Sequence, residues 1–247
     1  MKIVYHEDYC KVYSSDPAAQ PGRIESIYNE LKGIFEFIKP DPATEEDLRL
    51  VHSDEHIKNV KVLGLAYEIA ILAVGGAIKA AELAFMGEPS FALIRPPGHH
   101  ASRDSAWGFC YFNNIAIAIE WLRRRRMINS ALIIDIDLHY GDGTANIFKD
   151  VPMVSYLHLT YDDSIRALSD YLNGKRGYDI IAVSAGFDRH IDDWGGMWRT
   201  EDYEEIGRLI KLYAKKECKG RRFAILEGGY NLQVLGKNVK ALLKGME

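Results

Sequence analysis

The alternation of short, unbroken apolar runs with longer amphipathic segments is the feature that most constrains how this chain can fold. The runs are rich in Val, Ile and Leu and lack polar alternation, which is typical of strands that are covered on both sheet faces. They predict buried strands at residues 3–5, 91–94, 131–136, 153–157, 180–184 and 223–226. The segments between them predict helices at residues 23–38, 111–126 and 232–243, and one that starts near Glu201 with Thr200 as its N-cap.

Strands that alternate with helices indicate an α/β fold. We expect one domain over residues 1–247, with a mostly parallel central sheet and helices on both faces. The length of 247 residues is enough for one large domain of this class. In such folds ligand sites form at the carboxyl ends of the strands. Functional side chains are therefore expected directly after the predicted strands.

Composition and charge argue against several classes of protein. The formal net charge of −4 gives no sign of a nucleic-acid surface, so no direct nucleic-acid binding is expected. The three cysteines lie far apart and form no CxxC pair, which fits a reducing cytoplasm better than a disulfide framework. The first residues contain no apolar h-region, and no apolar run reaches the roughly 20 residues of a membrane helix. We expect a cytoplasmic protein without a membrane anchor, and a homo-oligomer is left open.

Carboxylate and imidazole side chains gather after the strand predicted at residues 131–136. Asp135 is followed by Asp137 and His139, and alternate residues of an extended segment project to one side, so the last two can reach one ion. Both groups are normal zinc ligands. Further carboxylates follow the strand at residues 180–184, and any of them can complete the site: Asp188, Asp192 and Asp193. Two oxygens and one nitrogen leave a position open, which indicates a catalytic metal site.

Two other strands are followed by groups suited to proton transfer and oxyanion stabilisation. Adjacent His99 and His100 come after a rigid Pro-Pro-Gly loop, and histidine titrates in the range that proton transfer at neutral pH needs. The last strand is followed by Gly228, Gly229 and Tyr230. The two glycines allow the backbone to approach a ligand closely, and the tyrosine hydroxyl can donate to a developing oxyanion.

Four sequence motifs carry these residues. In chain order they are RPPGHHA with GFCYFNN, DIDLHYGDGT, SAGFD followed by Asp193, and LEGGYNL. This set resembles the histone deacetylase superfamily, which includes acetylpolyamine amidohydrolases and acetoin-utilisation proteins. The resemblance implies an arginase/deacetylase-like fold. It also implies a zinc-dependent amidohydrolase that removes an acetyl or similar acyl group from an acyl-lysine, an acylated polyamine or another small acylated amine.

The resemblance assigns metals to the clustered acids. It implies one zinc ion per chain, held by Asp137, His139 and Asp193, and so selects one of the three acids that the residue pattern leaves open. It also implies a structural potassium ion with Asp135 among its ligands. This chain has Tyr156 where the family usually has a serine near that ion, which counts against potassium.

The resemblance also assigns catalytic roles. His99 and His100 form the catalytic pair, with His100 as general base and then general acid. Asp135 orients His99, and Asp142 orients His100. Tyr230 polarises the acyl carbonyl. The residues expected to line the substrate pocket are Gly108, Phe109 and Gly229, and Arg23 matches an arginine beside an internal acetate channel.

Two stretches are shorter than the family pattern, and two other functions remain open. Loops that usually form the pocket rim are absent between residues 56 and 75 and between residues 158 and 179, which predicts a wider and more exposed pocket. The first alternative function is an arginase-like ureohydrolase with two manganese ions. The second is a catalytically weak module that binds acyl ligands in an inherited pocket.

Overall fold

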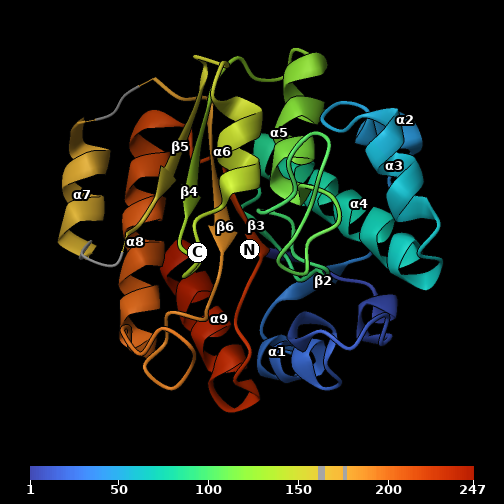
Figure 1. The fold of residues 1–247 in the computed structure, drawn as a ribbon. Helices are drawn as coiled ribbons and strands as arrows, with labels where there is room; N and C mark the ends of the chain where they lie inside the picture. Colours follow the sequence, from blue (N-terminus) through green and yellow to red (C-terminus); the bar gives the residue numbers. More distant parts are fainter. Residues whose placement is uncertain (161–164, 175–176) are drawn as a thin grey trace.

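The computed structural model describes residues 1–160, 165–174 and 177–247. The strands in these residues are β1 Lys2–Val4, β2 Glu36–Ile38, β3 Ser90–Ala92, β4 Ala131–Asp135, β5 Val154–His158, β6 Ile180–Ala185 and β7 Arg222–Leu226. They form a seven-stranded sheet in the order β2-β1-β3-β7-β6-β4-β5, and all neighbours are parallel (Figure 1). The prediction of a mostly parallel sheet is confirmed.

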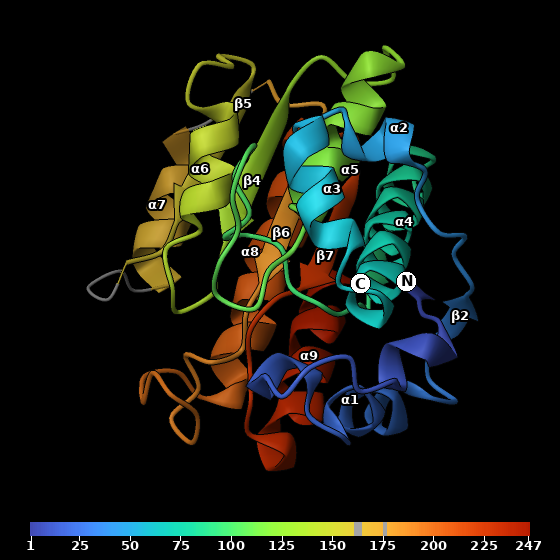
Figure 2. The ribbon, with the colours of Figure 1, turned by 45° about the vertical axis from the view of Figure 1, so that its right-hand side comes forward.

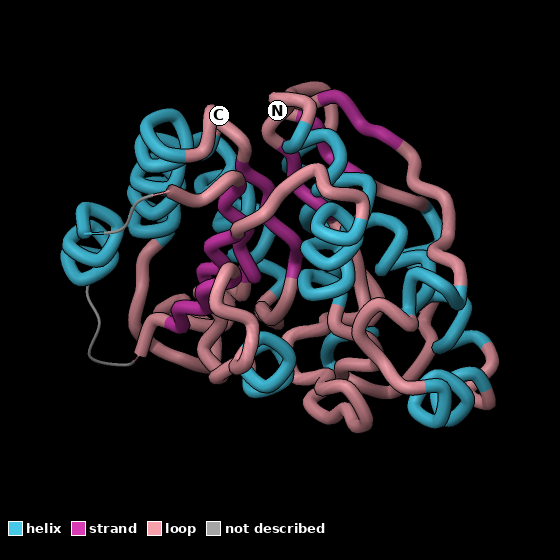
Figure 3. Tube along the Cα trace, turned by 90° about the horizontal axis from the view of Figure 1, so that it is seen from above, coloured by secondary structure: helices cyan, strands magenta, loops and turns pink. Residues whose placement is uncertain are grey.

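Helices cover both faces of the sheet. They are α1 Arg23–Leu31, α2 Glu45–Leu48, α3 Asp54–Lys61, α4 Leu65–Phe85, α5 Asn114–Arg124, α6 Asp142–Phe148, α7 Ile165–Gly174, α8 Thr200–Glu217 and α9 Leu232–Met246. Helices α4 and α5 pack against each other on one side, and α8 and α9 pack against each other on the other side (Figure 2). The view from above shows the strands running between these two groups (Figure 3). The predicted α/β architecture with helices on both faces is therefore confirmed.

The prediction of one helix over residues 23–38 is wrong. Helix α1 ends at Leu31, and the backbone of the next residue, Lys32, is extended. Residues Glu36–Ile38 form the edge strand β2, in which Phe37 lies opposite Ile3 of β1. The apolar residues of this segment fit a helical pattern, but pairing with β1 decides the structure, as tertiary context often overrides local propensity.

The start of helix α8 also differs by one residue from the prediction. The helix begins at Thr200, and Arg199 is the N-cap residue. The backbone N–H of Arg199 donates to Asp202 Oδ2 at 2.7 Å. Thr200 Oγ1 donates instead to Asn238 Oδ1 at 2.7 Å, which joins α8 to α9. A threonine that makes a tertiary contact is thus not free to cap its own helix.

The register of the central strands places the functional segments side by side. Strands β3, β7, β6 and β4 are consecutive neighbours, and all of their residues are buried. Asp135 at the end of β4 lies opposite Ser184, and Ala185 lies opposite Leu226 at the end of β7. Each large aliphatic side chain buried in these strands contributes about 1.5–3 kcal/mol. The carboxyl ends therefore form a rigid edge. In the described residues no helix is long and apolar enough to cross a membrane.

Candidate metal centre and active site

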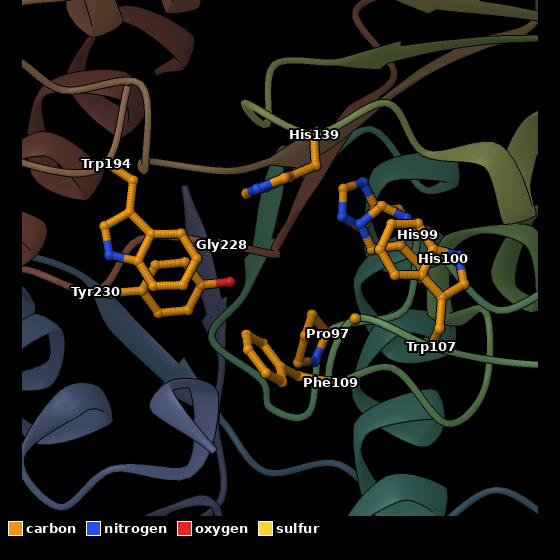
Figure 4. Close-up of a pocket in the computed structure, with 10 residues that line it drawn as sticks. Pro97, His99, His100, Trp107, Phe109, His139, Trp194, Gly228 and Tyr230 are labelled. Carbon is orange, nitrogen blue, oxygen red and sulfur yellow. The ribbon is translucent and has the colours of Figure 1, made fainter. Parts of the chain in front are cut away.

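The segments that follow β3, β4, β6 and β7 surround one cavity at the carboxyl edge of the sheet (Figure 4). Its volume is about 130 Å³. Imidazole rings, aromatic rings and glycine backbone make up most of its wall. The lining residues are Pro97, His99, His100, Trp107, Gly108, Phe109, His139, Trp194, Gly228 and Tyr230.

Asp137, His139 and Asp188 form a candidate metal group at this cavity. One ligand atom from each residue lies within 4.8 Å of the other two. His139 Nδ1 lies 3.2 Å from Asp137 Oδ1 and 3.0 Å from Asp188 Oδ2. Both carboxylates are buried, whereas His139 is partly exposed and projects into the cavity (Figure 4). Two carboxylates and one imidazole are a normal ligand set for zinc with an open coordination position.

The electrostatics of this group suit a divalent cation. Burial and the charge of Asp137 raise the pKa of Asp188 to about 7. Asp188 Oδ2 is buried, and its 3.0 Å ion pair with His139 Nδ1 lacks hydrogen-bond geometry. Contacts with the carboxylates of Asp137 and Asp188 raise the pKa of His139 to about 10. A cation between the carboxylates would relieve their repulsion and bind the buried Asp188 oxygen, so these residues fit a metal.

Gly228 allows the two carboxylates to pack against the backbone. Its N–H donates to Asp137 Oδ2 at 2.8 Å. A Cβ atom at this position would lie 2.5 Å from Asp137 Oδ2 and 2.8 Å from Asp188 Oδ2. Any residue with a side chain would therefore displace the metal group, which explains why a glycine follows Glu227 here.

The structure does not bring Asp193 into the metal group, in contrast to the ligand set implied by the resemblance. Asp193 Oδ2 accepts the backbone N–H groups of Tyr230 and Asn231, both at 2.8 Å, and Oδ1 accepts that of Trp194 at 2.8 Å. The first two donors lie at the start of helix α9, where a carboxylate is favourable. The group that the described residues bring within 4.8 Å therefore contains Asp188, and zinc binding by Asp193 stays a prediction.

Each histidine of the pair contacts the carboxylate that the resemblance assigns to it. His99 Nδ1 lies 3.1 Å from Asp135 Oδ2. His100 Nδ1 lies 2.7 Å from Asp142 Oδ1, at the start of helix α6. Both imidazoles line the cavity (Figure 4). A carboxylate on Nδ1 fixes the ring orientation and stabilises the protonated imidazole, as a general base requires.

The two imidazoles differ in their electrostatic surroundings. Burial is the largest effect on His99 and lowers its pKa, but the charges of Asp137 and Asp135 outweigh it and raise the pKa of His99 well above the ordinary value. Burial and the neighbouring His99 lower the pKa of His100, although Asp142 opposes them. His100 is therefore the neutral imidazole of the pair at neutral pH, the form that accepts a proton.

Trp107 holds the His100–Asp142 pair in place. Its indole stacks on the His100 ring with 3.9 Å between centroids. Its Nε1–H donates to Asp142 Oδ2 at 3.0 Å. The sequence analysis does not single out this residue, although it stands directly before Gly108 and Phe109. From the sequence alone, a tryptophan before Gly108 does not indicate a role in catalysis. The role becomes evident only when the structure shows its hydrogen bond to the Asp142 carboxylate.

The Tyr230 hydroxyl points into the cavity from the side opposite the two histidines (Figure 4). The Tyr230 ring stacks on Trp194 with 4.0 Å between centroids and meets the edge of Phe109. Burial and the charge of Asp137 raise the pKa of Tyr230 above its ordinary value. The hydroxyl therefore keeps its proton and can act as a hydrogen-bond donor.

Arg23 fixes the backbone that carries this tyrosine. Arg23 is fully buried, and its Nε donates to the carbonyl oxygen of Gly229 at 2.8 Å and its Nη2 to that of Glu227 at 2.6 Å. The guanidinium carbon lies 5.5 Å from the centroid of the Tyr230 ring. Gly229 thus serves as an anchoring point for Arg23, and its neighbour Gly228 lines the cavity instead.

Gly108 and Phe109 both line the cavity. Gly108 has a φ of +59°, and a Cβ atom there would lie 2.4 Å from His100 Cδ2, so only glycine fits beside this imidazole. The two exposed tryptophans, Trp107 at 57% and Trp194 at 52% exposure, stand at the cavity as well. These exposed rings form part of the cavity wall where the loops are short, and the wider pocket stays a prediction.

Glu227 is a further buried acid that the sequence analysis does not assign. Its Oε2 accepts the backbone N–H groups of Gly98 at 2.7 Å and His99 at 3.2 Å, and its Oε1 accepts the Ser184 hydroxyl. Burial raises the pKa of Glu227 to about 7. The residue ties the end of β7 to the histidine loop. Its position directly after an apolar strand is the signal that would have identified it.

The fold and the side chains around the cavity define a class of protein. A metal group, a histidine oriented by a carboxylate, and a protonated tyrosine hydroxyl at the carboxyl edge of a parallel sheet are the parts of a metal-dependent hydrolase. The family model described as the histone deacetylase domain matches residues 17–165 and 172–246. The chain belongs to the histone deacetylase family.

Similar proteins have names of the same kind. A probable deacetylase from Archaeoglobus fulgidus is 31% identical over an alignment that covers 94% of this chain and 81% of that protein. The human protein named Polyamine deacetylase HDAC10 is 27% identical, and the alignment covers 96% of this chain and 46% of that protein. The crystal structure of the HDA15 HD domain superposes with a TM-score of 0.86 at 23% identity, covering 99% of this chain and 88% of that one. The structural likeness confirms the deacetylase-like fold, and the named relatives are consistent with a metal-dependent deacetylase.

Proposed function

We propose that this chain is a zinc-dependent amidohydrolase that releases acetate or another small acyl group from an acylated amine. The observation that carries the proposal is the meeting of three parts at one cavity (Figure 4). These parts are the metal group, the His100–Asp142 pair and the Tyr230 hydroxyl. Each part has a distinct task in hydrolysing an amide.

Asp137, His139 and Asp188 would hold one zinc ion. The support for this set is the mixture of two carboxylates and one imidazole, together with the buried oxygen of Asp188, whose contact with His139 lacks hydrogen-bond geometry. When bound, zinc would polarise the acyl carbonyl and lower the pKa of a nearby water molecule.

His100 moves the proton. In its neutral form it takes a proton from the attacking water through the nitrogen that Asp142 does not contact. The Asp142 carboxylate stabilises the imidazolium that results, and Trp107 keeps both groups aligned. The same imidazolium then gives the proton to the leaving amine. Burial and the neighbouring His99 lower the pKa of His100, which favours this return of the proton.

Tyr230 stabilises the charge that develops on the carbonyl oxygen. Its hydroxyl remains protonated and points at the cavity, its ring stacks on Trp194, and Arg23 holds the preceding residue Gly229. A preorganised donor of this kind typically contributes about 3 kcal/mol to transition-state stabilisation. The stacking and hydrogen bonds around the ring supply the preorganisation.

The substrate class is an acylated primary amine, either an acyl-lysine or an acylated polyamine. Aromatic walls from Phe109, Trp107 and Trp194 suit the apolar acyl group and the methylene stem of such an amine. The name of the human relative, a polyamine deacetylase, supports the amine part of the proposal. The volume of about 130 Å³ favours small acyl groups over long ones.

Acetate release tests the proposal. Metal-free protein would be loaded with zinc or with manganese and offered an acetyl-lysine peptide, an acetylated diamine and an acetylated polyamine. We expect acetate from at least one of them, about one zinc ion per chain, and loss of release with a chelator. Binding of an acylated amine without acetate release would support the binding module instead. Urea release with two manganese ions per chain would support the ureohydrolase.

A further inference from the structure

Arg189, the residue that follows the metal-group acid Asp188, is fully buried beneath the metal group. Its guanidinium donates to backbone carbonyl oxygens rather than pointing to solvent. Nε lies 3.1 Å from the oxygen of Ile136 and 3.0 Å from that of Asp137, and Nη2 lies 2.9 Å from the latter. Nη1 donates to Thr160 at 3.1 Å, and Nη2 also donates to Leu159.

These carbonyl oxygens belong to two segments that carry or support the metal group. Ile136 and Asp137 follow β4 and lead into His139, whereas Leu159 and Thr160 follow β5. A single guanidinium therefore joins the ends of two adjacent strands at the place where the ligands leave the sheet. Removal of its donors would take a hydrogen bond from each of these carbonyl oxygens, and a buried polar group that loses its partner costs about 1–3 kcal/mol.

The side chain of Arg189 is itself held from several sides. Its guanidinium carbon lies 5.0 Å from the centroid of the Trp198 ring, and Nη2 lies 3.3 Å from His158 Nε2. The backbone carbonyl of Arg189 accepts the N–H groups of Met197 and Trp198. Burial lowers the pKa of Arg189 below its ordinary value, and the charges of Asp137 and Asp188 oppose this by favouring the protonated guanidinium. The guanidinium is therefore a fixed positive charge beside two acids that repel each other.

The polar atoms near this charge do not fit the potassium ion that the resemblance implies. Such an ion would need Asp135 oxygens as ligands, because potassium is held by oxygen atoms in place of water. In this chain Asp135 Oδ1 accepts the N–H of Asp137 at 3.0 Å, and Oδ2 accepts the Tyr156 hydroxyl at 2.8 Å and contacts His99. The Asp135 carbonyl oxygen accepts the N–H of Leu159 at 3.1 Å. All three oxygens are thus engaged by protein donors.

We propose that Arg189 is a built-in cation that takes the structural place of a monovalent metal ion in this chain. It gathers the carbonyl oxygens around the metal-ligand segment and supplies the positive charge beneath Asp137 and Asp188. A guanidinium suits this task because it stays protonated, is weakly hydrated and presents five donors in a fixed plane. Because the cation is covalently attached, the metal group does not depend on the potassium concentration. Arg189 is in this sense a positioning residue for the ligands.

The first test uses the unaltered protein. Its melting temperature and its zinc affinity are measured in about 0.1 M potassium, sodium and choline chloride, so that the ionic strength is equal in all three. We expect superposable melting curves and equal zinc affinities. A melting temperature about 5 °C higher in potassium, or a zinc affinity about tenfold tighter, would overturn the proposal, since an ion that binds the folded state stabilises it.

The second test removes the guanidinium. We expect Arg189→Ala to melt about 5 °C lower and to bind zinc at least tenfold more weakly than the unaltered protein. Added guanidinium or potassium ions should restore part of both losses, because either can enter the opened group of carbonyl oxygens. Arg189→Lys keeps the charge with fewer donors, so its melting temperature and zinc affinity should lie between those of Arg189→Ala and the unaltered protein. Unchanged melting and zinc binding in Arg189→Ala would overturn the proposal.

Arg222 offers a matched control. It is also a buried arginine, and its guanidinium donates to the backbone carbonyl oxygens of Gly220, Met246 and Glu247, away from the metal group. Arg222→Ala should lower the melting temperature but leave zinc affinity unchanged. If Arg189→Ala fails to fold, the salt comparison on the unaltered protein still decides. Both readouts are independent of acetate release, so they stand even if the proposed activity is not found.

Discussion

Replacing Asp188 and Asp193 one at a time by Asn distinguishes the metal group of the structure from the ligand set that the resemblance implies. Both acids follow β6, and they are five positions apart in the chain. Asp188 is buried and its Oδ2 has no hydrogen-bond donor among the described residues, whereas three backbone N–H groups satisfy Asp193. The same chemical change is therefore expected to remove a metal ligand at position 188 and only the charge of a backbone acceptor at position 193.

The expected magnitudes differ by about two orders of magnitude. A zinc site with four protein ligands binds with about 10–16 kcal/mol, so the share of one ligand is about 3 kcal/mol. Loss of the Asp188 carboxylate should then weaken zinc binding about 100-fold. In Asp193→Asn the amide oxygen can still accept a backbone N–H, and the lost charge at the start of helix α9 costs about 1 kcal/mol of stability. Zinc affinity should change less than about threefold.

The assay is competition for zinc against a coloured chelator, combined with thermal unfolding of the metal-free proteins. The unfolding measurement shows whether a variant is folded, so that lost zinc binding is not mistaken for misfolding. Metal-free Asp188→Asn should be at least as stable as the unaltered protein, because burial and the charge of Asp137, which raise the pKa of Asp188 to about 7, no longer act on a carboxylate. The refuting result is the reverse pattern, in which Asp193→Asn loses zinc about 100-fold and Asp188→Asn retains it.

Three further predictions concern the residues around the metal group. Tyr230→Phe keeps the ring that stacks on Trp194 and should lower kcat about 100- to 1,000-fold with zinc content unchanged; full turnover in steady-state kinetics would contradict the oxyanion role. Trp107→Phe removes the N–H that Asp142 accepts and should lower kcat about fivefold and shift the acid limb of the pH–rate profile, whereas an effect on KM alone would contradict its positioning role. In metal-free protein the pKa of Glu227 is raised to about 7 from an ordinary 4.5. Between these pH values the folded state therefore keeps a proton on Glu227 that the unfolded state has lost. The free energy of unfolding should therefore fall by about 3 kcal/mol as the pH rises through this window, and denaturant unfolding of Glu227→Gln should lack this component.

Most of the sheet could be predicted because its strands are buried on both faces. Such strands are continuous apolar runs, and β3, β4, β6 and β7 consist entirely of buried residues. Strand β2 was not predicted, because it is not a buried, continuous apolar run. It has three residues and lies at the sheet edge, and its sequence continues the helical pattern of α1. Only its pairing with β1, which is remote in sequence, determines its conformation.

The sequence predicts which residues gather at the site, but not which of several neighbouring acids a loop directs into it. Acids and histidines placed directly after strands meet at one sheet edge, so Asp137, His139 and the His99–His100 pair follow from the pattern. Three acids within six residues follow β6, and residue spacing does not determine which of them faces His139. That choice depends on the turn that directs Asp193 to the start of α9.

The supporting residues needed the three-dimensional structure. Trp107 acts through a contact with Asp142, 35 positions away in the sequence. Arg189 looks like a surface arginine in the sequence, since a charged residue after a strand is usually solvated. Its burial becomes evident only when the carbonyl oxygens of Asp137 and Leu159 are seen around it. Buried cations that bind the backbone therefore have no sequence signal comparable to that of an apolar strand.

The most direct test of the central claim is a crystal structure of the zinc-loaded protein, with diffraction data collected on both sides of the zinc absorption edge. We predict one anomalous peak per chain, with oxygen and nitrogen atoms of Asp137, His139 and Asp188 about 2.0–2.2 Å away. The peak should lie in the cavity between His100 and the Tyr230 hydroxyl. A peak at another place, or a peak bound by Asp193 with Asp188 out of reach, would contradict the account.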